Sequence, residues 1–555
     1  MKSRLLAILL FCGGLSGLLA ASPPTPRYAI FETAFEAASA PANPYTAIRA
    51  AAWIFAPDGV RSIPLFWDGG KTWKLRISPD QAGAWSYRIE SNDSGLDGRT
   101  GRFMVTASDA PGGVRVSARW PNHFERQNGE PFWFLGDTAW GYFLDNPPKQ
   151  HARAQAEAYA RTRAAQGFNA IHCMLLSEEG DGNNGGPPFH DLSQERINPA
   201  YWQEVDRRLS FANRQGLTVG LALAWGDKRK KEPYAWSRFP SPEARKRYAR
   251  YIAARYSAYN VYFLVAGEWH AEIRTRPNAV EEQVFREFVE IGGVLAASDP
   301  HGRMCGIHPM TRHGSVREFA SAAWMSFADY QQNYRNLHAA ALLSRKMRGP
   351  VVNSEYGYFL RDADGDGHPD KDNSYTVEDM RHASWDIVMA GAYLVTGFGT
   401  TYFAGHRDPG PFDADAPKNR IWAAQIGHIK KFFEGLEWWR LAPADELLTS
   451  KAARTPDFTD ADPVNPKRSR LHPPKTVYWA MAAPGETYIL YVRGTTEPVR
   501  LDLAAHTRPY RVRQFDPRTG AYRSLEAPPR LNEYTYQAPD TQDWVVLLEA
   551  EPEGR

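Results

Sequence analysis

Residues 217–225 read LTVGLALAW, residues 242–256 read PEARKRYARYIAARY, and residues 261–267 read VYFLVAG. The first and third stretches are apolar runs of strand length, whereas the second has apolar residues at helical spacing behind a Ser-Pro start. A strand, a helix and a second strand in this order indicate a parallel βαβ unit. The same alternation predicts six further strands, at 131–136, 168–175, 304–309, 323–329, 350–355 and 398–405.

Eight strands, each followed by a helical segment, are the number found in a closed (β/α)8 barrel. The sequence therefore predicts a central (β/α)8 TIM barrel over residues 114–440, although the helix before the sixth strand is short. An open, doubly wound sheet is the alternative. It would leave one very long domain without a dinucleotide-binding signature.

Shorter alternating runs flank this region on both sides. Residues 22–113 hold strand patterns separated by turn signals such as Pro57-Asp58-Gly59, and residues 441–555 alternate again after a Pro-containing loop. This spacing favours sandwiches. We therefore expect a multidomain protein with an N-terminal β-sandwich and a C-terminal β-sandwich around the barrel.

The first 21 residues have the pattern of a secretory signal peptide. A short basic start, an apolar run over 5–19 and the small residues Ala20, Ala21 and Ser22 precede a Pro-rich segment. We expect a secreted or periplasmic protein with no membrane span in the mature chain. An uncleaved anchor is the alternative, but the apolar run is short for a span of roughly 20 residues.

Composition and cysteine content exclude several classes of protein. The 555 residues are 43% hydrophobic with a net charge of +3, which is ordinary for a globular chain and too balanced for a nucleic-acid binder that works by global charge. Beyond the leader only Cys173 and Cys305 remain. They fall on the second and fifth predicted strands, too far apart for a disulfide, so we expect both to be unpaired.

Two carboxylates follow apolar strands directly. Glu268 follows the fourth predicted strand and Glu355 the seventh, and barrel enzymes carry their active sites at this end of the strands. A general acid and a nucleophile on facing strands are what retaining glycoside hydrolysis requires. The neighbouring Trp269 and Tyr356 would help to keep one acid protonated. The alternative is that each glutamate forms a structural pair with an arginine.

Other residues near the predicted strand ends are candidates for substrate binding. Aromatic rings would stack on sugar C–H faces and polar groups would bind hydroxyls, although a lone histidine or tryptophan is at least as often structural. The candidates are Asp137, Trp140, His172, Trp225, Trp269, His308, Gln331, Tyr356, Tyr358, Tyr402 and His406.

The stretch FWFLGDTAWGYF at 132–143, the Gly-Glu-Trp at 267–269 and NSEYGY at 353–358, together with the flanking β-domains, resemble the apiosidase-like glycoside hydrolases. The resemblance implies a (β/α)8 enzyme with Glu268 as general acid/base, Glu355 as nucleophile and no catalytic cofactor. It also implies a plant or algal polysaccharide as substrate. This chain has Ala266-Gly267-Glu268 where many relatives have Gly-Gly-Asp, and Gly267 stands where the clan usually has Asn, so sugar specificity does not transfer.

Two charged loops carry separate predictions. Asp362, Asp364, Asp366, His368 and Asp370 place ligands at alternate positions with glycines between, which predicts a structural calcium site, against a solvated acidic loop. The basic run at 227–231 would attract an anionic polysaccharide, against a solvated surface loop.

Two other functions remain open at this point. One is a non-catalytic carbohydrate-binding protein on a barrel scaffold, which the two strand-end acids disfavour. The other is a secreted peptidase, which the lack of a metal motif or of a Ser or Cys catalytic constellation disfavours.

Overall fold

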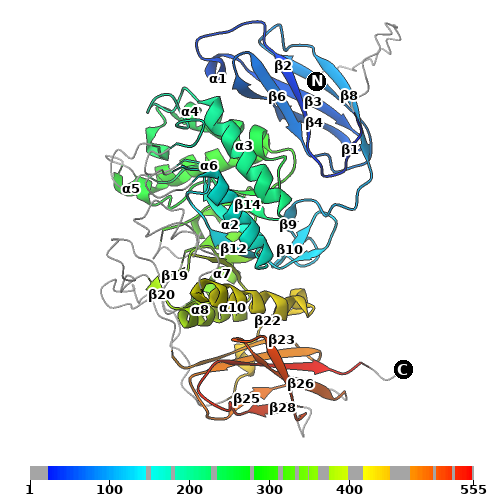
Figure 1. Ribbon diagram of the computed structural model, residues 1–555, viewed down its shortest axis with the longest axis vertical. Helices are drawn as coiled ribbons and strands as arrows, with labels where there is room; N and C mark the ends of the chain where they lie inside the picture. Colours follow the sequence, from blue (N-terminus) through cyan, green and yellow to red (C-terminus); the bar gives the residue numbers. More distant parts are fainter. Residues whose placement is uncertain are drawn as a thin grey trace, which may run out of the picture.

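Figure 1 shows a computed structural model with three parts stacked along its long axis: N-terminal sheets, a central strand-and-helix body, and C-terminal sheets. The structure describes residues 23–145, 152–176, 182–226, 234–275, 280–310, 317–331, 337–347, 349–359, 374–397, 417–449, 475–503, 508–527 and 532–552.

The central body is built on eight parallel strands hydrogen-bonded in the order β16-β15-β14-β13-β12-β21-β18-β17. Their inward residues and the helices outside them bury one large apolar core. In chain order the strands are β12 (Leu135–Thr138), β13 (Ala170–Met174), β14 (Thr218–Ala222), β15 (Val261–Leu264), β16 (Cys305–Gly306), β17 (Ala328–Tyr330), β18 (Val351–Asn353) and β21 (Tyr393–Thr396).

The two edges of this sheet meet beside β16 and β17. The Ser326 amide donates to the Cys305 carbonyl at 2.8 Å, and the Cys305 amide donates to Ser326 Oγ at 3.1 Å. These bonds bring the edges together, so the eight strands form the predicted, nearly closed barrel. Cys173 on β13 and Cys305 on β16 are buried and free, which confirms that they are unpaired.

Local sequence fixes where the barrel helices begin. The Asn198 and Ser241 side chains accept hydrogen bonds from the first turns of α3 and α4, and each helix has Pro in its first turn. The helices of the barrel are α2 (Arg153–Ala165), α3 (Pro199–Arg214), α4 (Pro242–Tyr256), α5 (Ala271–Thr275), α6 (Glu281–Ser298), α7 (Leu337–Arg345), α8 (Val377–Met389) and α10 (Pro417–Glu434), with 3-10 turns at Trp236–Arg238 and Arg317–Phe319.

One of the eight predicted strands is wrong and two are displaced. The first was placed at 131–136 and the sixth at 323–329, but the barrel strands β12 and β17 begin four and five residues further on. The eighth was placed at 398–405, but the strand that pairs with β12 and β18 is β21, which follows α8 directly. Gly391, at φ 72°, ends that helix early and lets the chain turn into the strand.

A small antiparallel sheet lies before the barrel, where the sequence predicted barrel. It consists of β9 (Val114–Val116), β10 (Phe124–Arg126) and β11 (Pro131–Phe132). Its Phe124 ring contacts Phe134, Phe327 and Tyr393, which stand at or before the starts of three barrel strands. The sheet therefore closes the bottom of the barrel, opposite the end where the strands finish.

The N-terminal part is a sandwich of a five-stranded sheet, in the order β1-β8-β7-β3-β4, and a three-stranded sheet, in the order β2-β6-β5, around its own apolar core. Its elements are β1 (Thr25–Pro26), β2 (Phe31–Glu36), α1 (Pro44–Ala47), β3 (Ala50–Ala56), β4 (Gly59–Pro64), β5 (Phe66–Gly69), β6 (Thr72–Ile77), β7 (Gly83–Ser91) and β8 (Thr100–Thr106).

A buried ion network attaches this sandwich to the barrel. Arg76 of β6 donates to Asp206 of α3 at 3.0 Å, and Arg255 of α4 donates to the same carboxylate at 2.6 Å and pairs with Asp68 of β5 at 2.9 Å. Burial alone would raise the pKa of Asp206, but the two guanidinium groups hold it below its usual value. The sandwich and the barrel thus share one buried cluster of charges.

The C-terminal part packs against the opposite side of the barrel, on α8 and α10 (Figure 1). Trp385 stacks on Tyr491 at 5.4 Å, and Arg493 pairs with Asp386 at 2.7 Å. Its sheets have the orders β22-β23-β24-β29-β26-β27 and β25-β28. The strands are β22 (Ala442–Pro443), β23 (Val477–Ala483), β24 (Thr487–Arg493), β25 (Val499–Asp502), β26 (Tyr510–Asp516), β27 (Ala521–Leu525), β28 (Glu533–Tyr536) and β29 (Trp544–Ala550).

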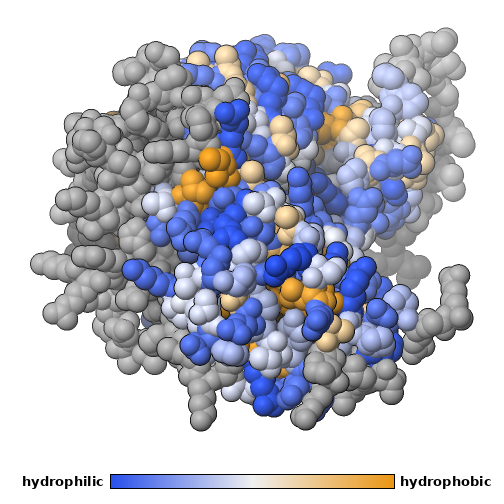
Figure 2. Space-filling model, turned by 60° about the horizontal axis from the view of Figure 1, so that its bottom comes forward, coloured by the Kyte–Doolittle hydropathy of each residue, from blue (hydrophilic) through white to orange (hydrophobic). Residues whose placement is uncertain are grey.

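Figure 2 shows the molecule turned so that its C-terminal end comes forward. The described part of this face is mostly hydrophilic, with small, separate apolar patches. Within the parts of the chain that the structure describes, no helix combines the length and apolarity needed to cross a bilayer.

Candidate active site

Glu268 and Glu355 both lie at the carboxyl ends of barrel strands. The pairing of β14 and β15 continues through a bridge between Trp225 and Gly267, so Glu268 is the next residue after the ladder. The Ser354 amide extends the pairing of β17 and β18 by donating to the Tyr330 carbonyl at 3.0 Å, and Glu355 follows it. The two glutamates are 8% and 4% exposed. In chain order their strands are the fourth and the seventh of the barrel.

His308 connects Glu355 to the barrel interior. Its Nε2 lies 3.1 Å from Glu355 Oε2, and its Nδ1 lies 2.9 Å from Ser354 Oγ and 3.4 Å from Asp329 Oδ2. His308 follows β16, Asp329 lies on β17, and Glu355 follows β18. Three consecutive barrel strands thus place a carboxylate on each side of one imidazole.

This arrangement favours a positive charge on His308. Burial alone would lower its pKa, but the Asp329 and Glu355 carboxylates outweigh burial and raise the pKa of His308 to about 10. The ring is therefore an imidazolium at neutral pH and donates to Glu355. Burial raises the pKa of Asp329, against the opposing effects of His308 and Ser354.

Glu268 has an unusual backbone and a specific partner. Its φ is +43°, in the left-handed region that residues other than glycine rarely adopt, and such conformations are concentrated at functional sites. Trp225 Nε1 donates to Glu268 Oε2 at 3.2 Å. The same indole covers Gly267: a Cβ there would lie 2.0 Å from Trp225 Cε3. Residue 267 must therefore be glycine, because the Trp225 ring that contacts Glu268 leaves no room for a Cβ.

An aromatic cluster surrounds the two acids at this end of the barrel. The Trp140 and Trp225 rings are 4.9 Å apart, and each lies within 5.6 Å of the His308 ring. His172 lies 5.6 Å from Trp140, and neither of its ring nitrogens has a hydrogen-bond partner among the described residues. Burial and the nearby His308 hold the pKa of His172 well below its usual value, so this ring is neutral. The structure thus brings Trp140, His172, Trp225 and His308 together with both glutamates.

Three of the candidate substrate-binding residues face away from this cluster. Asp137 lies within β12 and accepts hydrogen bonds from Arg163 and Tyr159 of α2, each at 2.7 Å, so its carboxylate faces the helices and not the barrel mouth. A structural pair with an arginine was the alternative considered above for Glu268 and Glu355, and here it is Asp137 that forms one. The register explains the error, because the strand begins at Leu135 and places Asp137 inside it.

Trp269 and Tyr356 are the other two. Trp269 is fully buried against Phe288 and Phe319, and Tyr356 is bonded to Ser384 of α8 at 2.7 Å. Neither ring is available to a sugar. They point outward because each directly follows an inward-facing acid and takes the opposite side of the chain.

Of the remaining predicted residues, Gln331 and Tyr358 are described by the structure and the others are not. Gln331 follows β17 and is 3% exposed, and Tyr358 lies on β19 (Tyr358–Phe359), which pairs with β20 (Ser374–Tyr375). Tyr402, His406, the loop at 227–231 and the predicted calcium ligands Asp362, Asp364, Asp366, His368 and Asp370 lie outside the described residues. Among the residues that are described, no group of three His, Cys, Asp or Glu side chains is arranged to hold a metal ion.

Asp329 and Ser354 are part of the site but were not among the predicted site residues. The signal available in the sequence was their position: Asp329 is a carboxylate inside an apolar strand, and Ser354 directly precedes the predicted nucleophile. Both serve the imidazole, whose orientation they fix.

Comparison with solved structures shows the same architecture in glycoside hydrolases. A Bacteroides vulgatus protein assigned to the glycoside hydrolases has a TM-score of 0.72 at 17% identity and covers 96% of this chain and 100% of its own. A second glycoside hydrolase has a TM-score of 0.62 at 17% identity, over 80% of this chain and 98% of its own. A family 5 glycoside hydrolase from Bacteroides vulgatus has a TM-score of 0.62 at 15% identity, over 79% and 93%.

Family models add a sequence-based assignment. Residues 24–92 match a domain of unknown function, DUF5060, and residues 121–440 match the apiosidase-like catalytic domain. No curated protein matches the chain. Because the apiosidase-like model spans more than half of the sequence and covers the whole barrel, the chain belongs to the apiosidase-like family of glycoside hydrolases.

Proposed function

We propose that the protein hydrolyses glycosidic bonds with retention of configuration, with Glu268 as general acid/base and Glu355 as nucleophile. The observation that carries this proposal is the contact between the His308 imidazolium and Glu355 Oε2 at 3.1 Å. A buried cation that donates to this oxygen stabilises a negative charge on the carboxylate and aims it. Glu268 accepts a hydrogen bond from a neutral donor, the indole N–H of Trp225, at 3.2 Å.

The reaction would proceed in two steps. Glu355 attacks the anomeric carbon while Glu268 gives its proton to the leaving oxygen, and a covalent glycosyl-enzyme forms. Glu268, now ionised, takes a proton from water, which attacks the same carbon and releases the sugar from Glu355. The two inversions restore the original configuration.

The substrate we propose is a plant or algal polysaccharide. The family model is described as apiosidase-like, so apiose-bearing glycans are the first to test. We further propose that residues 1–21 direct the protein to the outside of the cell or to the periplasm. N-terminal sequencing of the mature protein tests this, and a chain that still begins at Met1 would contradict it.

A screen of plant and algal polysaccharides with product chromatography tests the function, and proton NMR of the first product gives the anomeric configuration. We expect release of sugars by the native protein and none by the Glu355→Gln variant. A polysaccharide that binds without release of any product would favour the alternative, a non-catalytic carbohydrate-binding protein.

A further inference from the structure

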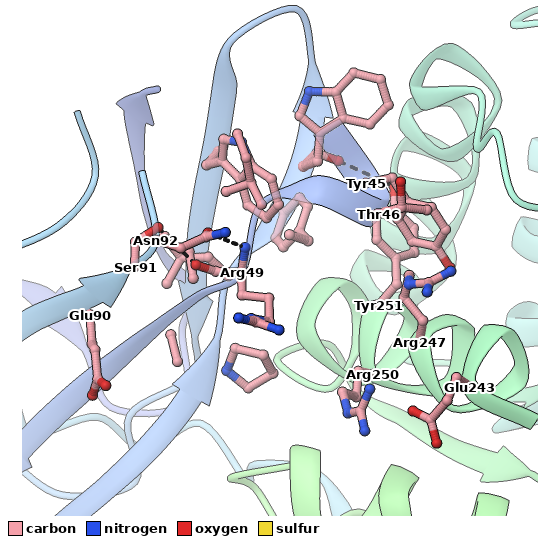
Figure 3. Close-up of a pocket in the computed structure, with 18 residues that line it drawn as sticks. Tyr45, Thr46, Arg49, Glu90, Ser91, Asn92, Glu243, Arg247, Arg250 and Tyr251 are labelled. Atoms are coloured by element: carbon pink, nitrogen blue, oxygen red, sulfur yellow. Dashed lines mark hydrogen bonds between the residues drawn. The ribbon is translucent and has the colours of Figure 1, made fainter. Parts of the chain in front are cut away.

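A cleft of about 840 Å³ lies between the N-terminal sandwich and helix α4 of the barrel. Figure 3 shows side chains entering it from both domains: Arg49 and Asn92 from the sandwich, Arg247 and Arg250 from α4. The cleft also has an aromatic wall, where Tyr251 of α4 packs edge-on against Tyr45 and Phe66 of the sandwich. The cleft is separate from the candidate active site and contains none of its residues.

Among the described residues, two arginines of the cleft have no side-chain partner, whereas its other charged residues do. Its lining contains Arg49, Arg247 and Arg250 with Glu90 and Glu243, and Arg247 pairs with Glu195 at 3.5 Å. Both glutamates have partners: Glu90 accepts from Trp53 Nε1 at 2.9 Å, and Glu243 from Lys246 Nζ at 3.2 Å. No described residue bonds to the guanidinium groups of Arg49 and Arg250, and both side chains are exposed. These two arginines are available to an anion that enters from solvent.

The floor of the cleft continues onto an exposed aromatic surface. Ala51 of β3 pairs with Pro64 on one side and with Glu90 on the other, and all three line the cleft. Two residues further along the same face of β3 stands Trp53, which is 42% exposed. Its indole is held by Glu90, the residue that also lines the cleft. An exposed, fixed tryptophan beside a polar cleft is suited to stacking on a pyranose ring.

The cleft lies on the side of the barrel, along α4. A barrel helix starts near the carboxyl end of the strand before it, where the active site lies. The residues of α4 that line the cleft, Glu243, Arg247, Arg250 and Tyr251, come from the first three turns of that helix. The cleft thus begins near the end of the barrel that carries the active site and extends along α4.

We propose that this cleft is a second carbohydrate-binding site, for an oligosaccharide segment that carries carboxylates, as uronic acids do. Arg49 and Arg250 bind the carboxylates from opposite walls, since a guanidinium matches a carboxylate in a bidentate manner. Trp53 stacks on a neighbouring ring. The site joins the two domains, so it exists only in the full chain, and its occupancy does not depend on catalysis.

Calorimetric titration with a tetrasaccharide of galacturonic acid at low ionic strength tests the proposal, with the neutral tetrasaccharide of galactose as the second ligand. Every protein in the comparison carries Glu355→Gln, so that no ligand is cleaved. Replacing Arg49 and Arg250 by Gln is expected to weaken binding of the acidic ligand by about tenfold or more, because two charge-assisted contacts are lost. Ala51→Trp, which fills the cleft without a change of charge, is expected to weaken it as well.

The matched control is Arg102→Gln with Arg214→Gln. It removes one exposed arginine from each domain outside the cleft and is expected to keep the affinity of the parent. Thermal melting checks that all variants are folded. Equal affinity of the Arg49/Arg250 variant and the control would overturn the proposal. So would equal binding of the neutral tetrasaccharide, or binding of a sulfated tetrasaccharide in place of the uronate.

Discussion

Burial of the His308 imidazole between Trp140 and Trp225 would by itself favour the neutral ring, yet Asp329 and Glu355 raise the pKa of His308 from 6.5 to about 10. A group whose pKa is higher in the folded than in the unfolded state stabilises the folded protein when it is protonated. For His308 this stabilisation is complete below pH 6.5 and is lost as the pH rises through about 10. We therefore expect the free energy of unfolding to fall between these pH values.

Urea denaturation across this pH range, with native protein and with His308→Gln, measures the effect. The variant lacks the titrating ring, so its stability should fall less steeply than that of the native protein over the same interval. Parallel curves for the two proteins would show that His308 is not charged in the folded state.

Gly267 gives a second test at the residue scale. A methyl group at this position would meet the Trp225 ring at 2.0 Å, so Gly267→Ala should destabilise the protein by about 1–3 kcal/mol and displace the donor to Glu268. Thermal or urea denaturation and kcat report the two effects.

The control for this change is Gly293→Ala. Gly293 lies in α6, and a Cβ there would contact nothing within 4 Å, so its replacement should not lower stability. The loss caused by Gly267→Ala should also shrink when Trp225 is Ala, because the clash is then absent. A similar loss in that background would contradict the assignment of the clash to Trp225.

Sequence could locate the two acids but not the residues that orient them. Glu268 and Glu355 follow long apolar runs, and the end of such a run is visible without a structure. Which neighbours face inward depends on strand register, which the apolar runs do not define to one residue. For this reason Asp137, Trp269 and Tyr356 were assigned to the site and Asp329 was not.

At the scale of elements, sequence failed where a strand followed a helix without a polar break. The pattern of α8 runs on through Met389, Ala390, Gly391 and Ala392 into β21, and every residue of that junction is apolar or glycine. Pairing with β12 and β18 decides the strand, and this contact is not local. The other barrel strands were located, two of them displaced by four or five residues, because charged helices or loops separate them.

The docking of the N-terminal sandwich depends on Asp206 of α3, which holds both Arg76 and Arg255. Asp206→Asn would leave two buried guanidinium groups without their shared anion. We expect a loss of about 3–5 kcal/mol in the free energy of unfolding.

Denaturation followed by tryptophan fluorescence measures this loss. The matched control is Asp58→Asn, which breaks the solvent-accessible pair with Arg61 and should cost about 1 kcal/mol or less. Equal losses for the two variants would contradict the view that the buried network attaches the sandwich to the barrel.

The acidic loop at 362–370 follows the segment that carries Glu355, and its five alternating ligands still predict a calcium site. Chelator treatment should lower the melting temperature of the native protein, and added calcium should restore it. The variant Asp364→Asn/Asp366→Asn should melt at the chelated temperature with or without calcium. A melting temperature that chelator leaves unchanged would remove the prediction.

At the scale of the whole molecule, the three-part arrangement could be predicted from the spacing of apolar residues along the sequence. Apolar residues recur every two residues in the flanking sheets and about every 3.6 residues in the barrel helices. The small sheet at 114–132 was assigned to the barrel because its strands are too short to show a period of their own. Contacts between the parts, such as Arg493 with Asp386, join residues more than a hundred positions apart and leave no local pattern.

The assignment of the two acids is tested most directly by azide rescue on a substrate with an activated leaving group, with the anomeric configuration of the product read by proton NMR. In Glu268→Ala the glycosyl-enzyme still forms on Glu355, and azide replaces the carboxylate, so the glycosyl azide should have the retained configuration. In Glu355→Ala azide takes the place of the nucleophile and attacks opposite the leaving group, so the product should have the inverted configuration. Near-native turnover by either variant without azide, or the same configuration from both, would contradict the account.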